Sequence, residues 1–182
     1  MFVPDVEHIL NHYLAASDDI VEDGMTWYNR AREFALSLDE NVSRAAAVVA
    51  VISANTSWTA NKTLAIKAYQ GDMAVGFPDK VRKVTRLFSG ESPDTVLGGT
   101  KVRTFYATIL DPTASHPAVI DRHAFDIAIN KRLGSAKRPL GKANYALFAD
   151  TYANAASLAG ITTQQMQAIT WVQWRKSNGI TA

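Results

Sequence analysis

The sequence contains no cysteine. This absence excludes disulfide bonds, cysteine-ligated zinc and iron–sulfur clusters held by cysteines. Long apolar runs are also missing, because the longest one, Ala45–Ala54, includes a serine and falls well short of the roughly 20 residues that a membrane-spanning helix needs. The N-terminal segment MFVPDVEHIL lacks the basic residues that open a secretory signal. We therefore expect a cytoplasmic, intracellular protein with no membrane contact.

Sheet signals are absent as well. No stretch alternates strictly between apolar and polar residues over five positions with turn formers at both ends, and there is no internal repeat or low-complexity tail. The 182 residues are 47% hydrophobic, which is ample for the core of one compact unit. The expected fold class is all-α.

Helical spacing and end signals predict where these helices lie. Residues 43–53 could be a buried strand by periodicity, but their length and alanine content favour a central helix. An acidic linker ending at Gly24 is expected to separate the first two helices, Thr59 to cap the fourth, and Thr162 with Gln165 to form a capping box for the last. The remaining expected helices cover residues 6–15 and 27–38, a segment ending at Gly71, one from Pro78 to about Gly90, a short one after Ser92 and Pro93, and residues 143–159.

Charge is distributed unevenly along the chain, although the net charge is only +2. Residues 1–40 contain two basic and nine acidic residues, whereas residues 80–142 contain twelve basic and five acidic residues. An ordinary solvated surface with an uneven composition would also show this pattern. A basic segment is nevertheless typical of a surface that binds phosphates.

The basic segment contains two predicted helix starts. Gly98 and Gly99 form a turn that opens directly into a helix, and Asp121 precedes a second apolar periodic run. A helix start leaves backbone N–H groups unpaired and carries the positive end of the helix dipole. The first start can therefore hold a phosphate, and the second favours an ionised Asp121. This combination suggests chemistry on nucleic acid.

These residues carry a family resemblance. GGTKV followed by VIDRHAFDIAINKRLG resembles the hairpin and catalytic segment of the helix-hairpin-helix DNA glycosylases related to endonuclease III and 8-oxoguanine DNA glycosylase. A second match, VVAVISANTSWTANKTLA, is similar to the family segment that supplies a residue filling the gap left by the extruded base. The resemblance implies two helical lobes with the active cleft between them, approximately residues 26–115 and residues 1–25 plus 116–182. Because cysteine is absent, no iron–sulfur cluster is expected.

The resemblance also implies site residues. Asp121 would be the catalytic carboxylate, stabilising the oxocarbenium-like sugar and helping to activate water, while the same aspartate can serve simply as a helix cap. Lys101 matches the amine nucleophile of members that also cleave the strand, and its alternative role is to contact a phosphate. Gly98, Gly99 and Thr100 would bring the hairpin amides to the DNA backbone, with a monovalent cation at the turn.

Further DNA contacts are expected around these positions. Asn55 would fill the gap in the duplex, with Ser53 and Trp58 beside it, although Trp58 can equally belong to the core. His123 is among the expected DNA-binding residues, and its ring is expected to support the local structure. His8 and His12 are expected to be a surface pair without a metal, and Phe105, Tyr106 and Phe125 to be either base-stacking or core residues. The expected contacts to the DNA backbone are Arg103, Arg122, Lys131, Arg132, Lys137 and Arg138.

The sequence thus predicts a DNA glycosylase that flips a damaged or modified base out of double-stranded DNA and cleaves its N-glycosidic bond, with or without AP-lyase activity through Lys101. The first alternative is the same scaffold used to bind DNA, or to exchange groups on modified pyrimidines, without releasing a base. The second is a structural helical protein in which the motif occurs by chance. No cofactor beyond the monovalent cation is expected, and a monomer is the default. A small chain of this kind would suit a phage source.

Overall fold

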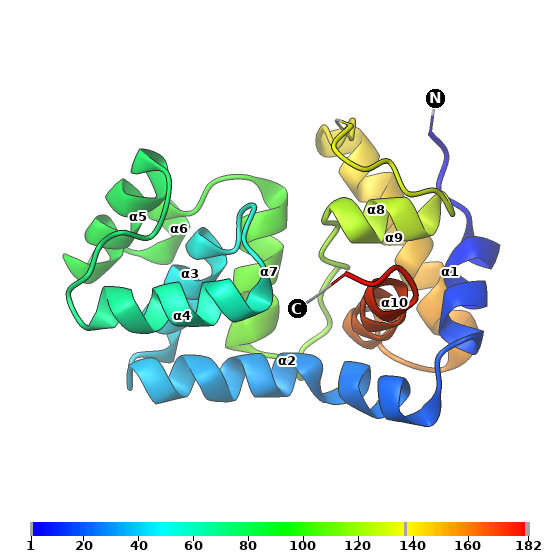
Figure 1. Cartoon of the computed structure of the whole chain (residues 1–182), viewed down its shortest axis with the longest axis horizontal. Coiled ribbons are helices and arrows are strands. Elements are labelled where there is room, and N and C mark those ends of the chain that lie inside the picture. Colours follow the sequence, from blue (N-terminus) through cyan, green and yellow to red (C-terminus); the bar gives the residue numbers. More distant parts are fainter. Residues whose placement is uncertain (1, 137, 181–182) are drawn as a thin grey trace. The chain divides into compact units, whose positions relative to one another are not determined.

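The protein is all-helical, as the sequence predicts. A computed structural model describes residues 2–136 and 138–180, and this part of the chain contains ten helices and no strand (Figure 1). None of the helices in these described ranges is long and apolar enough to cross a membrane. The helices are α1 (Val6–Leu14), α2 (Asp18–Leu38), α3 (Val42–Ile52), α4 (Trp58–Tyr69), α5 (Pro78–Phe88), α6 (Pro93–Val96), α7 (Thr100–Leu110), α8 (Arg122–Ala128), α9 (Lys142–Ala159) and α10 (Thr163–Ser177).

Contacts within the chain divide it into two units. The central unit is residues 29–112, and the terminal unit is made of the described residues of 1–28 and 113–181. Helix α2 contributes its first half to the terminal unit and its second half to the central unit. The sequence-based division set the corresponding boundaries at about residues 26 and 115.

The central unit is built around α3, which packs against α4, α5, α6 and α7. Every residue from Ala45 to Ile52 is buried. The prediction of a central helix in this segment, rather than a strand, is confirmed. Small alanine side chains all round the helix allow neighbouring helices to approach it on several faces.

The terminal unit packs α1, α8, α9 and α10 against one another. Phe125 of α8 stacks on Phe148 of α9 with ring centroids 4.4 Å apart, and both rings are buried. The buried hydroxyl of Tyr152 donates to the Ala124 carbonyl at 3.0 Å, which joins α9 to the first turn of α8. The core of this unit thus fixes the start of α8, where Asp121 lies.

Two predicted helix starts are wrong. The acidic segment before Trp27 is not a linker, because α2 runs unbroken from Asp18 to Leu38. Gly24 lies buried inside that helix, where a Cβ atom would stand 2.5 Å from the Cα of Ile169 on α10. This glycine is there for close helix packing and not to end a helix. The N-cap of α4 is Ser57 and not Thr59, since the Ser57 hydroxyl accepts the Ala60 N–H.

Other end signals act as predicted. Thr162 and Gln165 form the capping box of α10, and Gly160 ends α9 in the left-handed conformation. Pro78 lies in the first turn of α5, and Ser92 caps α6. All of these signals operate over a few residues, which explains why the sequence alone reveals them.

Candidate functional site

Asp121 caps α8 with its carboxylate. Oδ1 accepts the backbone N–H groups of His123 at 2.9 Å and Ala124 at 2.8 Å. Oδ2 accepts the indole N–H of Trp171, on α10, at 3.0 Å. Each carboxylate oxygen has about two lone-pair directions, so Oδ1 is fully used while Oδ2 keeps one acceptor position. The geometry therefore leaves Oδ2 as the oxygen able to act on another group.

The indole of Trp171 is itself held in place. The Arg175 guanidinium lies over the indole ring, 4.3 Å from its centroid, and the rings of Trp27 and His123 meet it edge-on at centroid distances of 5.9 Å and 6.3 Å. Burial lowers the pKa of the Arg175 guanidinium, which remains charged at neutral pH. The indole that donates to Asp121 is consequently held by one cation and two further aromatic rings.

The Asp121 charge influences the pKa values of Tyr28, His123, Tyr152 and Arg175. Burial lowers the pKa of His123, and the negative charge of Asp121 opposes this shift. Burial also raises the pKa of Tyr28 well above its usual value, and Asp121 adds to that shift. The Tyr28 hydroxyl donates to Gln167 Oε1 at 2.8 Å, so this tyrosine is a neutral, fixed part of the surroundings. Exposed Arg122 donates from Nε to His123 Nε2 at 3.2 Å.

The glycine turn joins α6 to α7 in the central unit. Gly99 is the N-cap of α7 with φ of 72°, which lies in the region that favours glycine, and no described side chain caps that helix start. Gly98, Gly99 and Thr100 are all exposed. The first N–H groups of α7 are therefore accessible, as binding of a phosphate requires.

The glycine turn also has carbonyl oxygens that could bind the monovalent cation implied by the resemblance. The carbonyl oxygens of Leu97 and Gly98 accept no hydrogen bond from the described part of the chain. Such oxygens are suitable ligands for a monovalent cation.

Lysine side chains gather near the turn. Lys101 is half-buried in the first turn of α7, and its charge lowers the pKa of Lys80, a shift caused mainly by burial of Lys80. A Cβ atom on Gly98 would lie 3.8 Å from Lys83 Nζ. Arg103 has a structural contact, because its Nη2 donates to the Asp94 carbonyl of α6 at 3.0 Å. Arg103 thus joins α7 to α6 across the glycine turn.

The segment between α3 and α4 contains the expected gap-filling residue. Asn55 is exposed, with φ of 56° in the left-handed region. The Ser53 hydroxyl donates to the Ala50 carbonyl at 2.7 Å and so ends α3. Trp58 packs edge-on against Phe34 with centroids 5.8 Å apart. Of the three residues, Asn55 is therefore the one presented to solvent by the backbone.

Some expected contacts have another role. Arg138 does not project freely as a phosphate contact would, because its guanidinium pairs with buried Asp126 at 2.5 Å and donates to the Gly134 and Ala136 carbonyls. Phe105 and Phe125 are core residues, and half-buried Tyr106 bonds through its hydroxyl to the Ser43 hydroxyl. Lys131 and Arg132 are exposed, and Lys137 lies outside the described residues.

The two histidines of α1 are not a surface pair, because both are partly buried and each has a structural partner. His8 Nδ1 lies 3.2 Å from the Ala128 carbonyl, and the His12 ring meets Trp174 edge-on at 5.1 Å. No group of three or more metal-ligating side chains occurs in the residues that the structure describes.

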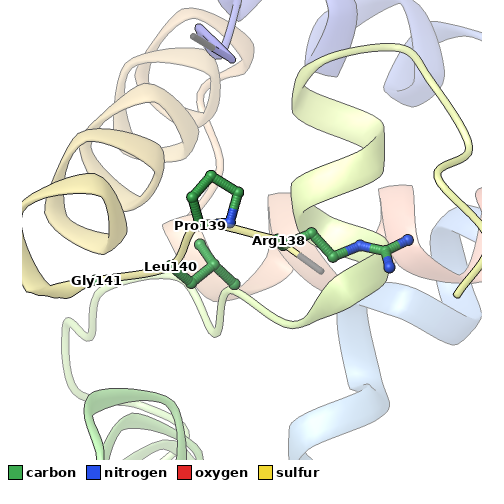
Figure 2. Close-up of a pocket in the computed structure, with 4 residues that line it drawn as sticks. All are labelled: Arg138, Pro139, Leu140 and Gly141. Carbon is green, nitrogen blue, oxygen red and sulfur yellow. The ribbon is translucent and has the colours of Figure 1, made fainter. Parts of the chain in front are cut away.

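A pocket of about 600 Å³ opens beside the loop that leads into α9 (Figure 2). Its lining includes Arg138, Pro139, Leu140 and Gly141. Figure 2 shows the Arg138 side chain extending away from Pro139 and Leu140, consistent with its pairing to Asp126. Of the residues expected to contact DNA, only Arg138 is among these lining residues, and its guanidinium is already paired with Asp126.

Sequence reasoning missed Trp171, Arg175 and Lys80. The separation of Trp171 and Arg175 by four positions places them on one face of α10, which could have signalled a stacked pair. Nothing local to α5 distinguishes Lys80 from a surface lysine. Its role depends on residues 24 and 28 positions earlier in the chain.

Comparison with known proteins gives one match. No curated protein and no solved structure matches the chain. A family model described as "Family of unknown function (DUF7178)" matches residues 4–178, nearly the whole chain. The chain therefore belongs to the DUF7178 family.

Proposed function

We propose that this protein is a DNA glycosylase with a fold of the helix-hairpin-helix glycosylase type. The observation that carries the proposal is the Asp121 carboxylate, which stands at the start of α8, within the motif VIDRH, and is fixed by three hydrogen bonds. A catalytic carboxylate must be held in one orientation before substrate arrives, because reorganisation during the reaction would cost free energy. Asp121 meets that requirement.

The proposed reaction is hydrolysis of the bond between the base and the deoxyribose C1′ atom. The bond breaks with its electron pair leaving on the base, which takes up a proton, and positive charge develops on the sugar. The Asp121 carboxylate stabilises that charge, and the remaining lone pair of Oδ2 orients the water whose oxygen then bonds to C1′ and loses a proton.

The central unit supplies the proposed DNA contacts. The accessible amides at Gly99, Thr100 and Lys101 would bind a backbone phosphate, and the carbonyls of Leu97 and Gly98 would contribute ligands to a monovalent cation there. Asn55 would occupy the space left by the flipped nucleotide, since its exposed amide can pair with the orphaned base. Lys101 would contact the phosphate, or act as the amine nucleophile if the enzyme also cleaves the strand.

A base-release assay tests the proposal. Duplexes carrying a panel of damaged and modified bases are incubated with the wild-type protein, Asp121→Asn, Lys101→Ala and a control variant, Asp150→Asn. Asp150 is exposed on α9 in the same unit as Asp121, so its substitution removes the same charge away from the site. Asparagine also caps helices well, so Asp121→Asn should stay folded, which thermal denaturation checks.

We expect Asp121→Asn to lower the rate of base release about 100-fold or more, within the range typical of acid–base and electrostatic catalysis, and Asp150→Asn to leave it unchanged. Strand cleavage without alkali that is lost in Lys101→Ala would assign the lyase role to Lys101. Cleavage only after alkali would assign Lys101 to binding. Salt-dependent binding of DNA without release of any base would favour the alternative, a base-modifying or DNA-binding protein, over the glycosylase. Absence of DNA binding would overturn both proposals.

A further inference from the structure

Lys80 is a buried lysine whose charge has no acidic partner in the described part of the chain. Its side chain starts on α5 and is 7% exposed as a residue. Nζ donates to the Ile52 carbonyl at 2.8 Å and to the Thr56 hydroxyl at 2.8 Å. Both acceptors are neutral. Buried ammonium groups are normally paired with carboxylates, so this position is unusual for a lysine that only stabilises a core.

The two acceptors of Lys80 lie on either side of Asn55. Ile52 is the last residue of α3, and Thr56 stands one residue after Asn55. The Thr56 N–H also bonds to the Ser53 carbonyl at 3.3 Å, and its hydroxyl lies 3.2 Å from the Ala54 carbonyl. One ammonium group therefore holds both ends of the turn that places Asn55 at a positive φ.

The stem of Lys80 runs beside the chain segment that leads into α5. A Cβ atom on Gly76, which has φ of 118°, would lie 3.4 Å from Lys80 Cδ, which is close to ordinary van der Waals contact. The Phe77 ring has its centroid 6.0 Å from Nζ. The Lys80 side chain therefore lies along the residues that precede α5 before its ammonium reaches the turn.

We infer that Lys80 is a positioning residue, which holds the turn of residues 53–57 so that Asn55 is presented to DNA in one conformation. The inference rests on the proposed function for the role of Asn55, while the hold of Lys80 on the turn can be measured in the free protein. Lys80 acts through Asn55 and does not itself contact the substrate base. The positive charge of nearby Lys101 disfavours the protonated form of Lys80. A DNA phosphate bound at the glycine turn would offset that repulsion and so stabilise the Lys80 ammonium.

Three variants test the role of Lys80. Lys80→Met keeps an unbranched apolar stem and removes the ammonium. Thr56→Val removes one of its two acceptors with little change of volume, and serves if Lys80→Met does not fold. Arg82→Met is the control, because Arg82 is exposed on the same helix and its loss removes one positive charge without touching the turn.

The first measurement is amide hydrogen exchange in the free proteins. We expect Lys80→Met and Thr56→Val to increase exchange in residues 53–57 about tenfold or more, as loss of hydrogen bonds to a buried charge implies, with no such increase in Arg82→Met. Unchanged exchange in both variants would overturn the inference, whether or not the protein is a glycosylase.

The second measurement is binding to a duplex with a stable abasic-site analogue and to the matched intact duplex. Lys80→Met should bind the abasic duplex about tenfold more weakly than Arg82→Met does. The two variants should bind the intact duplex equally well. When Lys80→Met is combined with Asn55→Ala, the extra loss of affinity should disappear, because Asn55→Ala has already removed the DNA contact through which Lys80 acts. An undiminished loss in that background would show that Lys80 does not act through Asn55. Failure of the wild-type protein to bind either duplex would overturn the proposed function and with it this use of Asn55, while the exchange result would still decide whether Lys80 holds the turn.

Discussion

The indole N–H of Trp171 donates a 3.0 Å hydrogen bond to Oδ2 of Asp121, 50 residues earlier in the chain. The two backbone bonds to Oδ1 arise from the helix start itself, whereas this third bond comes from α10. It fixes the rotation of the carboxylate about its own axis. The Arg175 guanidinium lies over the face of the same indole, 4.3 Å from its centroid, and so helps to hold the donor in place.

Trp171→Phe should lower the rate of base release about tenfold while leaving DNA affinity unchanged, because the carboxylate remains present but is free to rotate. The assay is the base-release measurement made on the wild-type protein. Trp174→Phe is a matched control, since Trp174 lies on the same helix and its buried indole nitrogen has no hydrogen-bond partner among the described residues. A Trp171→Phe enzyme that is fully active below its melting temperature would show that this bond is only structural.

Gly24→Ala should destabilise the protein by about 1–3 kcal/mol, although alanine in a helix is normally better than glycine by about 1 kcal/mol. The reason is the 2.5 Å approach of the new Cβ to Ile169 Cα, which is backbone and cannot rotate aside. Urea denaturation measures the change in the free energy of unfolding. Glu33→Ala, at an exposed position of α2, is expected to change stability little. A stabilising effect of Gly24→Ala would contradict the close contact between α2 and α10.

Arg138→Met should lower the free energy of unfolding by about 3–5 kcal/mol, because it leaves the buried Asp126 carboxylate without its cation. The side chains of Arg138 and Asp126 are only 9% and 2% exposed. The comparison is Arg86→Met, whose ion pair with Glu91 is solvent-accessible and is expected to contribute about 0–1 kcal/mol. Chemical denaturation of both variants gives the two values. Equal losses would mean that the Asp126 pair contributes no more than a surface pair.

Stability should fall on mild acidification through His12 and His123. Burial lowers the pKa of both rings below the ordinary value of 6.5, and the charge of His8 or of Arg122 and Arg175 adds to this effect. The hydrogen bond between the side chains of His12 and Asn130, and the charges of Asp121 and Asp126 at His123, act in the opposite direction. A lowered pKa in the folded chain means that the unfolded chain binds protons first.

The contribution of these histidines is therefore fully present above pH 6.5 and is lost as the pH falls from there through the folded-state pKa values. Melting temperatures measured at about pH 7.5 and about pH 5.5 should show the loss. The double variant His12→Gln, His123→Gln should show a smaller drop between the two conditions. An identical drop in the double variant would assign the pH dependence to other groups.

The features that could be predicted from the amino-acid sequence are those governed by neighbouring residues. The cap of Asp121 on α8, the Thr162–Gln165 capping box and the glycine turn before α7 each depend on groups within about four positions. The helical class and the central position of α3 followed from spacing and alanine content for the same reason. The family resemblance also rests on such short segments, and it supplies a hypothesis about chemistry that no local rule could give.

Tertiary structure decided the rest. Gly24 resembles the last residue of a linker until Ile169 is brought against it, and Arg138 resembles a surface cation until Asp126 is buried beside it. The bond from Trp171 to Asp121 and the hold of Lys80 on the Thr56 turn join residues that are 50 and 24 positions apart. Such partners are chosen by packing of whole helices and not by sequence spacing, so the roles of these side chains appear only once the chain is folded.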